Sequence, residues 1–372
     1  MLFNSYRYMH KFRNMLKYQI EKSIQKICDE ESLMGKNKEQ VNGRMNIVTA
    51  LNRKYVKYTC VMLTSLLMNQ PDTDIHIYLL HSDLTQQDEE QLRALVENYN
   101  QNIHFLLVDK DIFSSELPTT QAWSMEAYYR LILLDILPLE IDRILYLDVD
   151  MIVNKSIKEL YWTDFEACYF CACRDMATEF PAMDMRDEIF KEQIEEGFTY
   201  FNSGMMLWNM EKLRGQYCFK DYMDLAESLD FKLRAPDQDL LNLMHYKQVK
   251  FLDEYQYDLF SKIAYDYGIR YEDVKRQTTI VHYAGMKPWQ GGEGVHYDIE
   301  QLWWDYAKLT PVYFELMEEF LHGSINNPFI YETLDNCFKV NKQLIEELGK
   351  SEAMCQHLLQ LVESNMADSG LK

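Results

Sequence analysis

Two carboxylates spaced one residue apart, Asp148 and Asp150, are the first candidates for chemistry in this chain. They follow directly after a short apolar run, residues 143–147. Two acids at i and i+2, at the carboxyl end of a strand, can turn both side chains toward one divalent cation, and such a cation can neutralise a diphosphate. The spacing alone is weak support, because Asp-x-Asp arises by chance in acidic chains and fits a solvated turn equally well.

A second segment far downstream strengthens the metal hypothesis. Residues 281–289 read Val-His-Tyr-Ala-Gly-Met-Lys-Pro-Trp. His282 offers an imidazole for a metal, Gly285 a place where backbone can approach a ligand, and Lys287 a charge that can pair with phosphate. Taken singly, His282 would be a satisfied core histidine and Lys287 a surface lysine before a proline turn. Together with the acid pair, they indicate chemistry on a nucleotide-activated substrate.

The composition limits the class of partner. The chain has 372 residues, 47% of them hydrophobic, which is enough for one large catalytic domain with appendages. Its formal net charge of −21 argues against a nucleic-acid partner, since that binding needs clustered lysine and arginine. An acidic protein that handles an anionic substrate must screen it locally, which again favours a bound cation.

We expect a cytoplasmic protein with reduced cysteines. No run of about 18 apolar residues predicts a transmembrane helix, and charged residues interrupt the N-terminus where a secretory signal would need an apolar core. The eight cysteines are irregularly spaced. Cys168, Cys171 and Cys173 resemble a metal clip, but the apolar run 167–173 that holds them is typical of a buried strand.

Residues 1–44 form an N-terminal extension in which apolar residues at three- and four-residue steps predict one helical stripe. Basic residues flank the stripe. This pattern fits a helix at an anionic membrane surface, such as the inner face of the cytoplasmic membrane, or a helix that docks a partner. It also fits a helix packed on its own domain, or translated sequence ahead of a start at Met45, and we rank these two interpretations first. The flanking basic residues are Arg7, Lys11, Arg13, Lys17, Lys22 and Lys26.

The pattern of residues 45–308 is that of an α/β catalytic domain. Thr85 and Asp88 resemble a capping box that opens a helix. Strands alternating with helices imply a largely parallel sheet, whose ligands bind at the carboxyl ends of strands. Glycine-rich loops for dinucleotides or P-loop phosphates are missing, so those chemistries are disfavoured. Strands are expected over 46–50, 75–80, 103–108 and 144–147, and helices over 55–68 and 126–137.

Residues 309–372 are expected to form a C-terminal helical region. Proline at the first helical position and glycine after the end predict a helix that starts at Thr310-Pro311 and stops near Gly323. Residues 324–372 look helical and amphipathic. Nothing in the chain indicates the oligomeric state.

Four motifs in this sequence resemble those of glycosyltransferase family 8, whose members are retaining enzymes and include bacterial lipopolysaccharide galactosyl- and glucosyltransferases and glycogenin. The resemblance runs from about Met45 to about Trp304, and four motifs in order are far more specific than any one of them. It implies a GT-A fold, a Rossmann-like mixed sheet flanked by helices. The motifs are Leu-Tyr-Leu-Asp-Val-Asp (145–150), Tyr-Phe-Asn-Ser-Gly (200–204), Asp-Gln-Asp (237–239) and His-Tyr-Ala-Gly-Met-Lys-Pro-Trp (282–289).

The resemblance implies a metal site beside a donor site. Asp148, Asp150 and His282 would bind Mn²⁺ or Mg²⁺, and the imidazole shifts the preference toward Mn²⁺. Lys287 would contact the departing diphosphate, which the backbone at Gly285 approaches closely. The other implied donor-binding positions are Ala50, Asn52, Tyr55, Arg130, Val149, Asn202 and Ser203.

The candidate catalytic residues implied by the resemblance are Asp175, Asp237, Gln238 and Lys287. Asp237, Gln238 and Asn202 would hydrogen-bond hydroxyls of the donor sugar, and Asp175 would lie near that sugar. Without the family, Asp175 would be a loop carboxylate, and the Asn-Ser-Gly run would be an ordinary turn.

Two donor positions carry an open alternative. Arg130 would reach the donor, but it could equally pair with Glu126 four residues earlier on a helix face. Asn52 departs from the family pattern, since the better-known bacterial members have an aspartate there that meets uracil. Asparagine can still hydrogen-bond the base, so uridine remains the expected donor base.

The expected reaction moves glucose or galactose from a UDP-hexose to a saccharide or glycolipid acceptor in cell-surface glycan or lipopolysaccharide synthesis. Gln238 is a poor nucleophile, so we favour a front-face path in which the leaving diphosphate takes the acceptor's proton. The glycine-rich run 291–294 is expected to close over the donor. Three rival hypotheses are a glycogenin-like protein that glycosylates its own tyrosine, a non-catalytic nucleotide-sugar-binding module, and a membrane-associated scaffold acting through residues 1–28.

Overall fold

The computed structural model describes residues 43–113, 116–119, 125–177, 189–292 and 296–325, with isolated positions between 339 and 354. The chain separates into two units, Met1–Gly43 and Arg44–Lys372, and the fold below belongs to the second. The helical stripe expected in residues 1–44, residues 293–294 of the 291–294 run and most of residues 324–372 lie outside the described residues.

A seven-stranded mixed sheet, in the order β3-β2-β1-β4-β7-β6-β8, forms the centre of the fold. The first four strands in this order are parallel, as the alternating pattern predicts. The sheet is largely parallel, as predicted, and the exception is β7, which runs antiparallel to both β4 and β6. The strands are β1 (Met45–Ala50), β2 (Ile75–His81), β3 (Asn102–Leu107), β4 (Arg143–Leu147), β6 (Phe170–Arg174), β7 (Phe201–Asn209) and β8 (Val249–Leu252).

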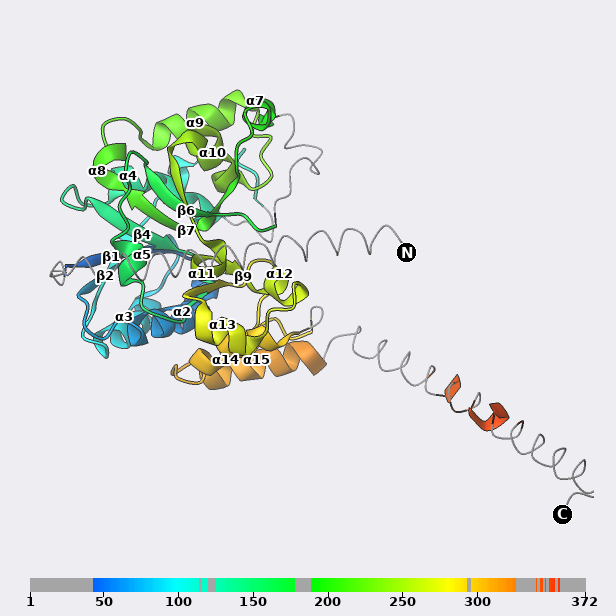
Figure 1. The fold of residues 1–372 in the computed structure, drawn as a ribbon. Helices are drawn as coiled ribbons and strands as arrows, with labels where there is room; N and C mark the ends of the chain where they lie inside the picture. The colour runs from blue at the N-terminus through cyan, green and yellow to red at the C-terminus, as the bar shows by residue number, and fades with distance from the viewer. Residues whose placement is uncertain are drawn as a thin grey trace, which may run out of the picture. The chain divides into compact units, whose positions relative to one another are not determined.

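Alternate residues of the central strands feed two hydrophobic cores, one on each face of the sheet. Leu145 and Leu207 belong to the core that includes α2 (Val56–Met68). Tyr146 and Met206 belong to the opposite core. Figure 1 shows α2 and α3 (Gln86–Glu97) on one side of the sheet and α8 (Met210–Leu213), α9 (Phe219–Ser228) and α10 (Pro236–His245) on the other. Because both faces are covered, the strands are near-continuous apolar runs.

A second, three-stranded sheet orders β5 (Met151–Val153), β10 (Ile280–His282) and β9 (Leu259–Phe260). β10 pairs antiparallel with β5, with His282 opposite Met151. It also pairs parallel with β9, with His282 opposite Phe260. This small sheet therefore fixes His282 beside the segment that leaves β4.

The helix expected over residues 126–137 is instead a 3₁₀ helix, η3 (Met125–Ile132), followed by the short α4 (Leu133–Ile136). Most of η3 is buried, including the charged Glu126 and Arg130. Packing on all sides outweighs intrinsic helix propensity at this position. The capping box of Thr85 and Asp88 is present as predicted, at the start of α3.

The helix expected to stop near Gly323 is α15, which spans Tyr313–Ile325 and so contains that glycine. Gly323 does not end the helix. It allows close contact with a loop, because a Cβ there would lie 2.2 Å from the carbonyl oxygen of Gly291. Between β8 and α15 the chain also forms α11 (Glu254–Tyr257), α12 (Ser261–Asp266), α13 (Tyr271–Gln277) and α14 (Gln301–Ala307).

The cysteine-rich run forms β6, with Cys171 and Cys173 buried and unpaired, as expected. The strand begins later than predicted, so Cys168 lies before it and is partly exposed. Within the part of the chain that the structure describes, every helix is too short or too polar to cross a membrane.

Candidate active site

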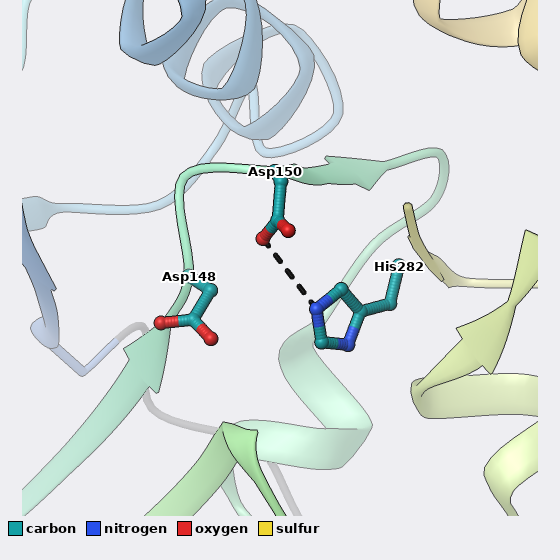
Figure 2. Close-up of side chains that lie close together, drawn as sticks. All are labelled: Asp148, Asp150 and His282. Atoms are coloured by element: carbon teal, nitrogen blue, oxygen red, sulfur yellow. Dashed lines mark ion pairs between the residues drawn. The ribbon is translucent and has the colours of Figure 1, made fainter. Parts of the chain in front are cut away.

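Asp148, Asp150 and His282 converge although His282 is far away in the sequence. Asp148 follows β4, Asp150 precedes β5, and His282 is the last residue of β10. One ligand atom from each of the three side chains lies within 4.8 Å of the other two. Figure 2 shows both carboxylates and the imidazole turned toward one region, with Nε2 of His282 3.4 Å from Oδ1 of Asp150. Two carboxylates and one imidazole form a donor set that suits Mn²⁺.

Backbone hydrogen bonds hold these three residues in place. The amide of Asp148 donates to the carbonyl of Gly204 on β7, at 2.9 Å. The amide of Tyr283, next to His282, donates to the carbonyl of Asp150 at 3.0 Å. The acid pair is thus fixed between the large sheet and the small sheet.

Gly204 leaves the space that the metal-binding side chains need. It lies within β7, so the Asn-Ser-Gly run is part of a strand and not the ordinary turn that it resembles when read without the family motifs. A Cβ on Gly204 would lie 2.7 Å from Cε1 of His282 and 2.8 Å from Oδ2 of Asp148. The sequence signal for this role is a glycine inside an apolar strand pattern, which marks close approach of other groups.

A basic side chain contacts each carboxylate of the acid pair. Lys287 pairs with Asp150 and donates to the carbonyl of Tyr283 at 3.0 Å. Arg130 pairs with Asp148 at 2.8 Å. Burial raises the pKa of Asp150, but Lys287 and His282 outweigh burial and hold that pKa well below its usual range. Burial dominates at Asp148, whose pKa is raised despite the nearby Arg130.

His282 lies between two carboxylates. Its Nδ1 is 2.9 Å from Oδ1 of the fully buried Asp258, which directly precedes β9. Burial lowers the pKa of His282, but Asp150 and Asp258 outweigh it and raise the pKa to about 10. Burial raises the pKa of Asp258 to about 6. Sequence reasoning missed Asp258, because it lies in none of the four motifs.

A network of amides and carboxylates adjoins the metal-binding side chains. Oε1 of Gln238 accepts from Nδ2 of Asn202 at 2.9 Å and from the amide of Ser203 at 2.8 Å. Nε2 of Gln238 donates to Asp175 at 2.9 Å. All four of these residues are buried. Their hydrogen bonds fix the direction of each polar group before any ligand arrives.

Asp237 connects this network to Arg130. Its carboxylate accepts from Nε of Arg130 at 3.0 Å and from Oγ of Ser203 at 3.1 Å. Arg130 contacts Asp148 and Asp237 rather than Glu126, the alternative partner considered from the sequence; Glu126 instead accepts from Nδ2 of Asn52 at 3.0 Å and lies near Lys110. A 3₁₀ helix winds more tightly than an α-helix, so residues 126 and 130 do not stack on one face.

The remaining predicted donor-binding residues surround the acid pair. Ala50 ends β1, which pairs in parallel with β4 and so brings the end of β1 beside Asp148. Tyr55 is half-buried, and burial raises its pKa. Lys287 lowers this pKa and Asp150 raises it, and both effects are smaller than that of burial. Val149 is buried between the two acids.

Asn52 and Gly285 add two local details. Oδ1 of Asn52 accepts from the amide of Lys54 at 3.1 Å, so both ends of the Asn52 amide have partners. Gly285 has φ +86°, a conformation that favours glycine, and a Cβ there would meet no atom of the described chain within 4 Å. The backbone at Gly285 therefore borders open space.

The mixed sheet, with a site at the carboxyl ends of β1 and β4, defines a GT-A fold with two acids and a histidine that could hold a metal ion. The chain belongs to glycosyl transferase family 8, whose sequence profile matches residues 46–292. The resemblance and the GT-A fold expected from the sequence are therefore confirmed.

Several relatives have been named for their activity. Lipopolysaccharide 1,2-glucosyltransferase of Escherichia coli is 27% identical over 254 residues, which are 66% of this chain and 73% of the relative. Lipopolysaccharide 1,3-galactosyltransferase of Salmonella typhimurium is 25% identical over 264 residues, again 66% and 73%. A Haemophilus influenzae relative whose glycosyltransferase name carries no substrate is 30% identical over 210 residues; the match spans 56% of this chain and only 62% of that protein.

One solved structure shares both the fold and a quarter of the aligned sequence. It is the galactosyltransferase LgtC, in complex with donor and acceptor sugar analogues. LgtC is 25% identical, with a TM-score of 0.62 over 72% of this chain and 96% of LgtC. This likeness supports the assignment of the fold.

Proposed function

We propose that this protein is a metal-dependent retaining glycosyltransferase that moves glucose or galactose from a UDP-sugar to a saccharide or glycolipid acceptor. The observation that carries the proposal is the convergence of Asp148, Asp150 and His282, with Lys287 beside them. A glycosyltransferase of this kind must bind an anionic diphosphate, and this chain has a net charge of −21. A cation site with an adjacent lysine supplies the positive charge that the donor requires.

We propose Mn²⁺ as the cation, with Mg²⁺ as the alternative. When bound, it would stabilise the negative charge that develops on the leaving diphosphate oxygen. Asp148, Asp150 and His282 would hold the cation, and Lys287, which pairs with Asp150 in this structure, would then be able to pair with the diphosphate. Arg130 pairs with both Asp148 and Asp237, so it would keep the Asp148 carboxylate oriented.

The amide network would bind the donor sugar. Asn202, Asp237 and Gln238 offer amide and carboxylate groups for sugar hydroxyls, and Asp175 lies within the same network. Gln238 is an unsuitable nucleophile, because its Oε1 accepts three hydrogen bonds from Asn202 and Ser203 and its amide is neutral. A front-face path therefore remains favoured. The bond from the sugar to the diphosphate breaks, the acceptor oxygen bonds to the same carbon, and the acceptor's proton passes to the leaving diphosphate.

The donor base and the cellular setting complete the proposal. We propose uridine as the base, bound near Ala50, Asn52 and Tyr55, with Val149, Ser203 and Gly285 lining the donor. We further propose that residues 45–308 are the catalytic domain and that residues 1–44 and 309–372 are helical additions. The lipopolysaccharide-related names of the relatives support a cytoplasmic enzyme of cell-surface glycan synthesis, working at the inner membrane face.

A donor screen tests this function. Release of UDP is measured with UDP-glucose and UDP-galactose, with and without Mn²⁺, for the wild-type protein and for Asp150→Ala. We expect metal-stimulated release from one donor, lost in the variant. Release by the variant at the wild-type rate, or no turnover with any UDP-hexose and acceptor glycan, would contradict the proposal.

A further inference from the structure

Asp258 and His282 form a buried pair outside the recognised motifs. Oδ1 of Asp258 lies 2.9 Å from Nδ1 of His282, and the Asp258 side chain is fully buried. Since a carboxylate can only accept, Nδ1 of the imidazole is the donor. The other ring nitrogen, Nε2, is thereby turned to Asp150. The edge of the Phe260 ring lies against the imidazole, with centroids 5.0 Å apart.

If the Asp258–His282 pair had only a structural role, its burial would cost folding free energy. Oδ2 of Asp258 is buried and meets no hydrogen-bond partner among the described residues. A buried carboxylate with an unsatisfied oxygen lowers stability unless another interaction compensates. An apolar residue would fill the same volume without this cost.

A second histidine–carboxylate pair, a partly exposed His296 with the buried Glu300, provides the contrast. Nδ1 of His296 pairs with Glu300, and Oε1 of Glu300 is also buried without a partner in the described chain. Nε2 of His296, however, has no hydrogen-bond partner among the described residues, and His296 is not part of the group of potential metal ligands found there. The two pairs share their chemistry, and only the pair at Asp258 aims its free nitrogen at two carboxylates.

We propose that Asp258 is the positioning residue of the metal site: it holds His282 with Nδ1 protonated and aims Nε2 at the cation shared with Asp148 and Asp150. This inference rests on the proposed function, because it needs a cation at that site. Histidines that bind metals are generally oriented by such a partner, and loss of the partner weakens metal binding by about 10- to 100-fold.

The experiment measures Mn²⁺ affinity in full-length protein saturated with UDP, by electron paramagnetic resonance of free Mn²⁺. The variants are Asp258→Leu, which removes the acceptor, and Asp258→Asn, whose amide oxygen can still accept from Nδ1. Glu300→Gln is the matched control. Thermal unfolding and circular dichroism check that each variant is folded.

We expect Asp258→Leu to weaken Mn²⁺ binding by about 10- to 100-fold, Asp258→Asn to weaken it less, and Glu300→Gln to leave it unchanged. The Mn²⁺ concentration that half-saturates transfer should rise by the same factors. Equal affinity in wild type and Asp258→Leu overturns the inference. If Asp258→Leu does not fold, Asp258→Asn decides, and an unchanged affinity there overturns it too. Absence of Mn²⁺ binding by the wild type would instead overturn the proposed function, and this inference with it.

Discussion

The two halves of the candidate site are built on different principles. The metal half comprises Asp148, Asp150 and His282 with the basic Lys287 and Arg130, which come from three chain segments. Within it, Lys287 and His282 pair with Asp150, and Arg130 pairs with Asp148. The amide half consists of side chains such as Asn202 and Gln238 that hydrogen-bond one another at about their ideal distances. The metal half can exchange partners when a ligand arrives. In the amide half, the hydrogen bonds fix the direction of the polar groups before a ligand binds.

This difference fits the part of the donor that each half would bind, the diphosphate with its cation in the metal half and the sugar in the amide half. A cation and a diphosphate bring charge, so the ion pairs of the metal half must rearrange around them. A sugar is neutral and is distinguished by the direction of its hydroxyls, so a preorganised amide half gives selectivity. Arg130 joins the halves through Asp148 and Asp237.

The largest effect is expected from removing a charge of the metal half. Asp150→Asn keeps the side-chain volume but removes the carboxylate that pairs with Lys287 and faces His282. We expect kcat/KM for transfer to fall by about 1000-fold, the scale on which a main electrostatic contact to the transition state acts. The exposed Asp142→Asn is the control, measured in the same assay. A loss of less than tenfold in Asp150→Asn would remove the distinction between the halves.

A smaller loss of metal affinity and transfer is expected from a change at Gly204, where the metal half meets the amide half. Gly204→Ala places a methyl group against His282 and Asp148, at distances that force both side chains to move. We expect Mn²⁺ affinity and transfer to fall by about 10- to 100-fold, at a cost in folding free energy of about 1–3 kcal/mol. Isothermal titration with Mn²⁺ and thermal unfolding measure the two effects. Wild-type metal binding by a folded Gly204→Ala protein would show that the close contact is not required.

In the amide half, Gln238→Ala removes the acceptor shared by Nδ2 of Asn202 and the buried amide of Ser203. Buried polar groups left unpaired cost about 1–3 kcal/mol each, so transfer should fall by about 10- to 100-fold while Mn²⁺ affinity stays unchanged. Steady-state kinetics and metal titration together make this test. A drop in Mn²⁺ affinity as large as the drop in transfer would mean that the halves are not separable.

The smallest effect concerns acid stability at the far end of α10, the helix that carries Gln238 near its start. Burial lowers the pKa of His245 from 6.5 to about 3. As the pH falls from 6.5 toward 3, His245 binds a proton in the unfolded chain but stays neutral in the folded chain. The free energy of unfolding contributed by this group therefore falls, by up to about 1.4 kcal/mol per pH unit.

Replacement of this histidine isolates its share of the acid sensitivity. His245→Gln should unfold in urea with a weaker pH dependence than the wild type between pH 6.5 and 4. Identical pH profiles would show that the imidazole titrates normally in the folded protein. The metal half should be unaffected, so Mn²⁺ binding of this variant at pH 7.5 serves as the internal control.

Much of the metal half could be predicted from the sequence, since its members lie in ordered motifs. Asp148 and Asp150 mark the end of an apolar strand, and His282 lies in a second motif. Asp258 could not be predicted, because its role depends on the pairing of the short β9 with β10 rather than on any local pattern. Pairing between short strands that are distant in sequence leaves little trace in local composition.

For the amide half, the sequence indicated which residues take part but not the secondary structure that holds them. Asn202, Ser203 and Gly204 look like a turn, yet they lie in β7, because the strand is buried between β4 and β6 and the polar side chains find partners on α10. Similarly, Gly323 suggests a helix end but supports a close contact inside α15. In these places tertiary contacts decide the structure, and local propensity gives the wrong answer.

The central claim is that one cation is bound by two carboxylates and one imidazole. Pulsed electron paramagnetic resonance of Mn²⁺ bound to the UDP-saturated protein tests it most directly, because a coordinated histidine nitrogen couples to the electron spin. We predict a single nitrogen coupling in the wild type that disappears in His282→Gln. Bound Mn²⁺ with no nitrogen coupling, or a coupling that survives in His282→Gln, would contradict this account.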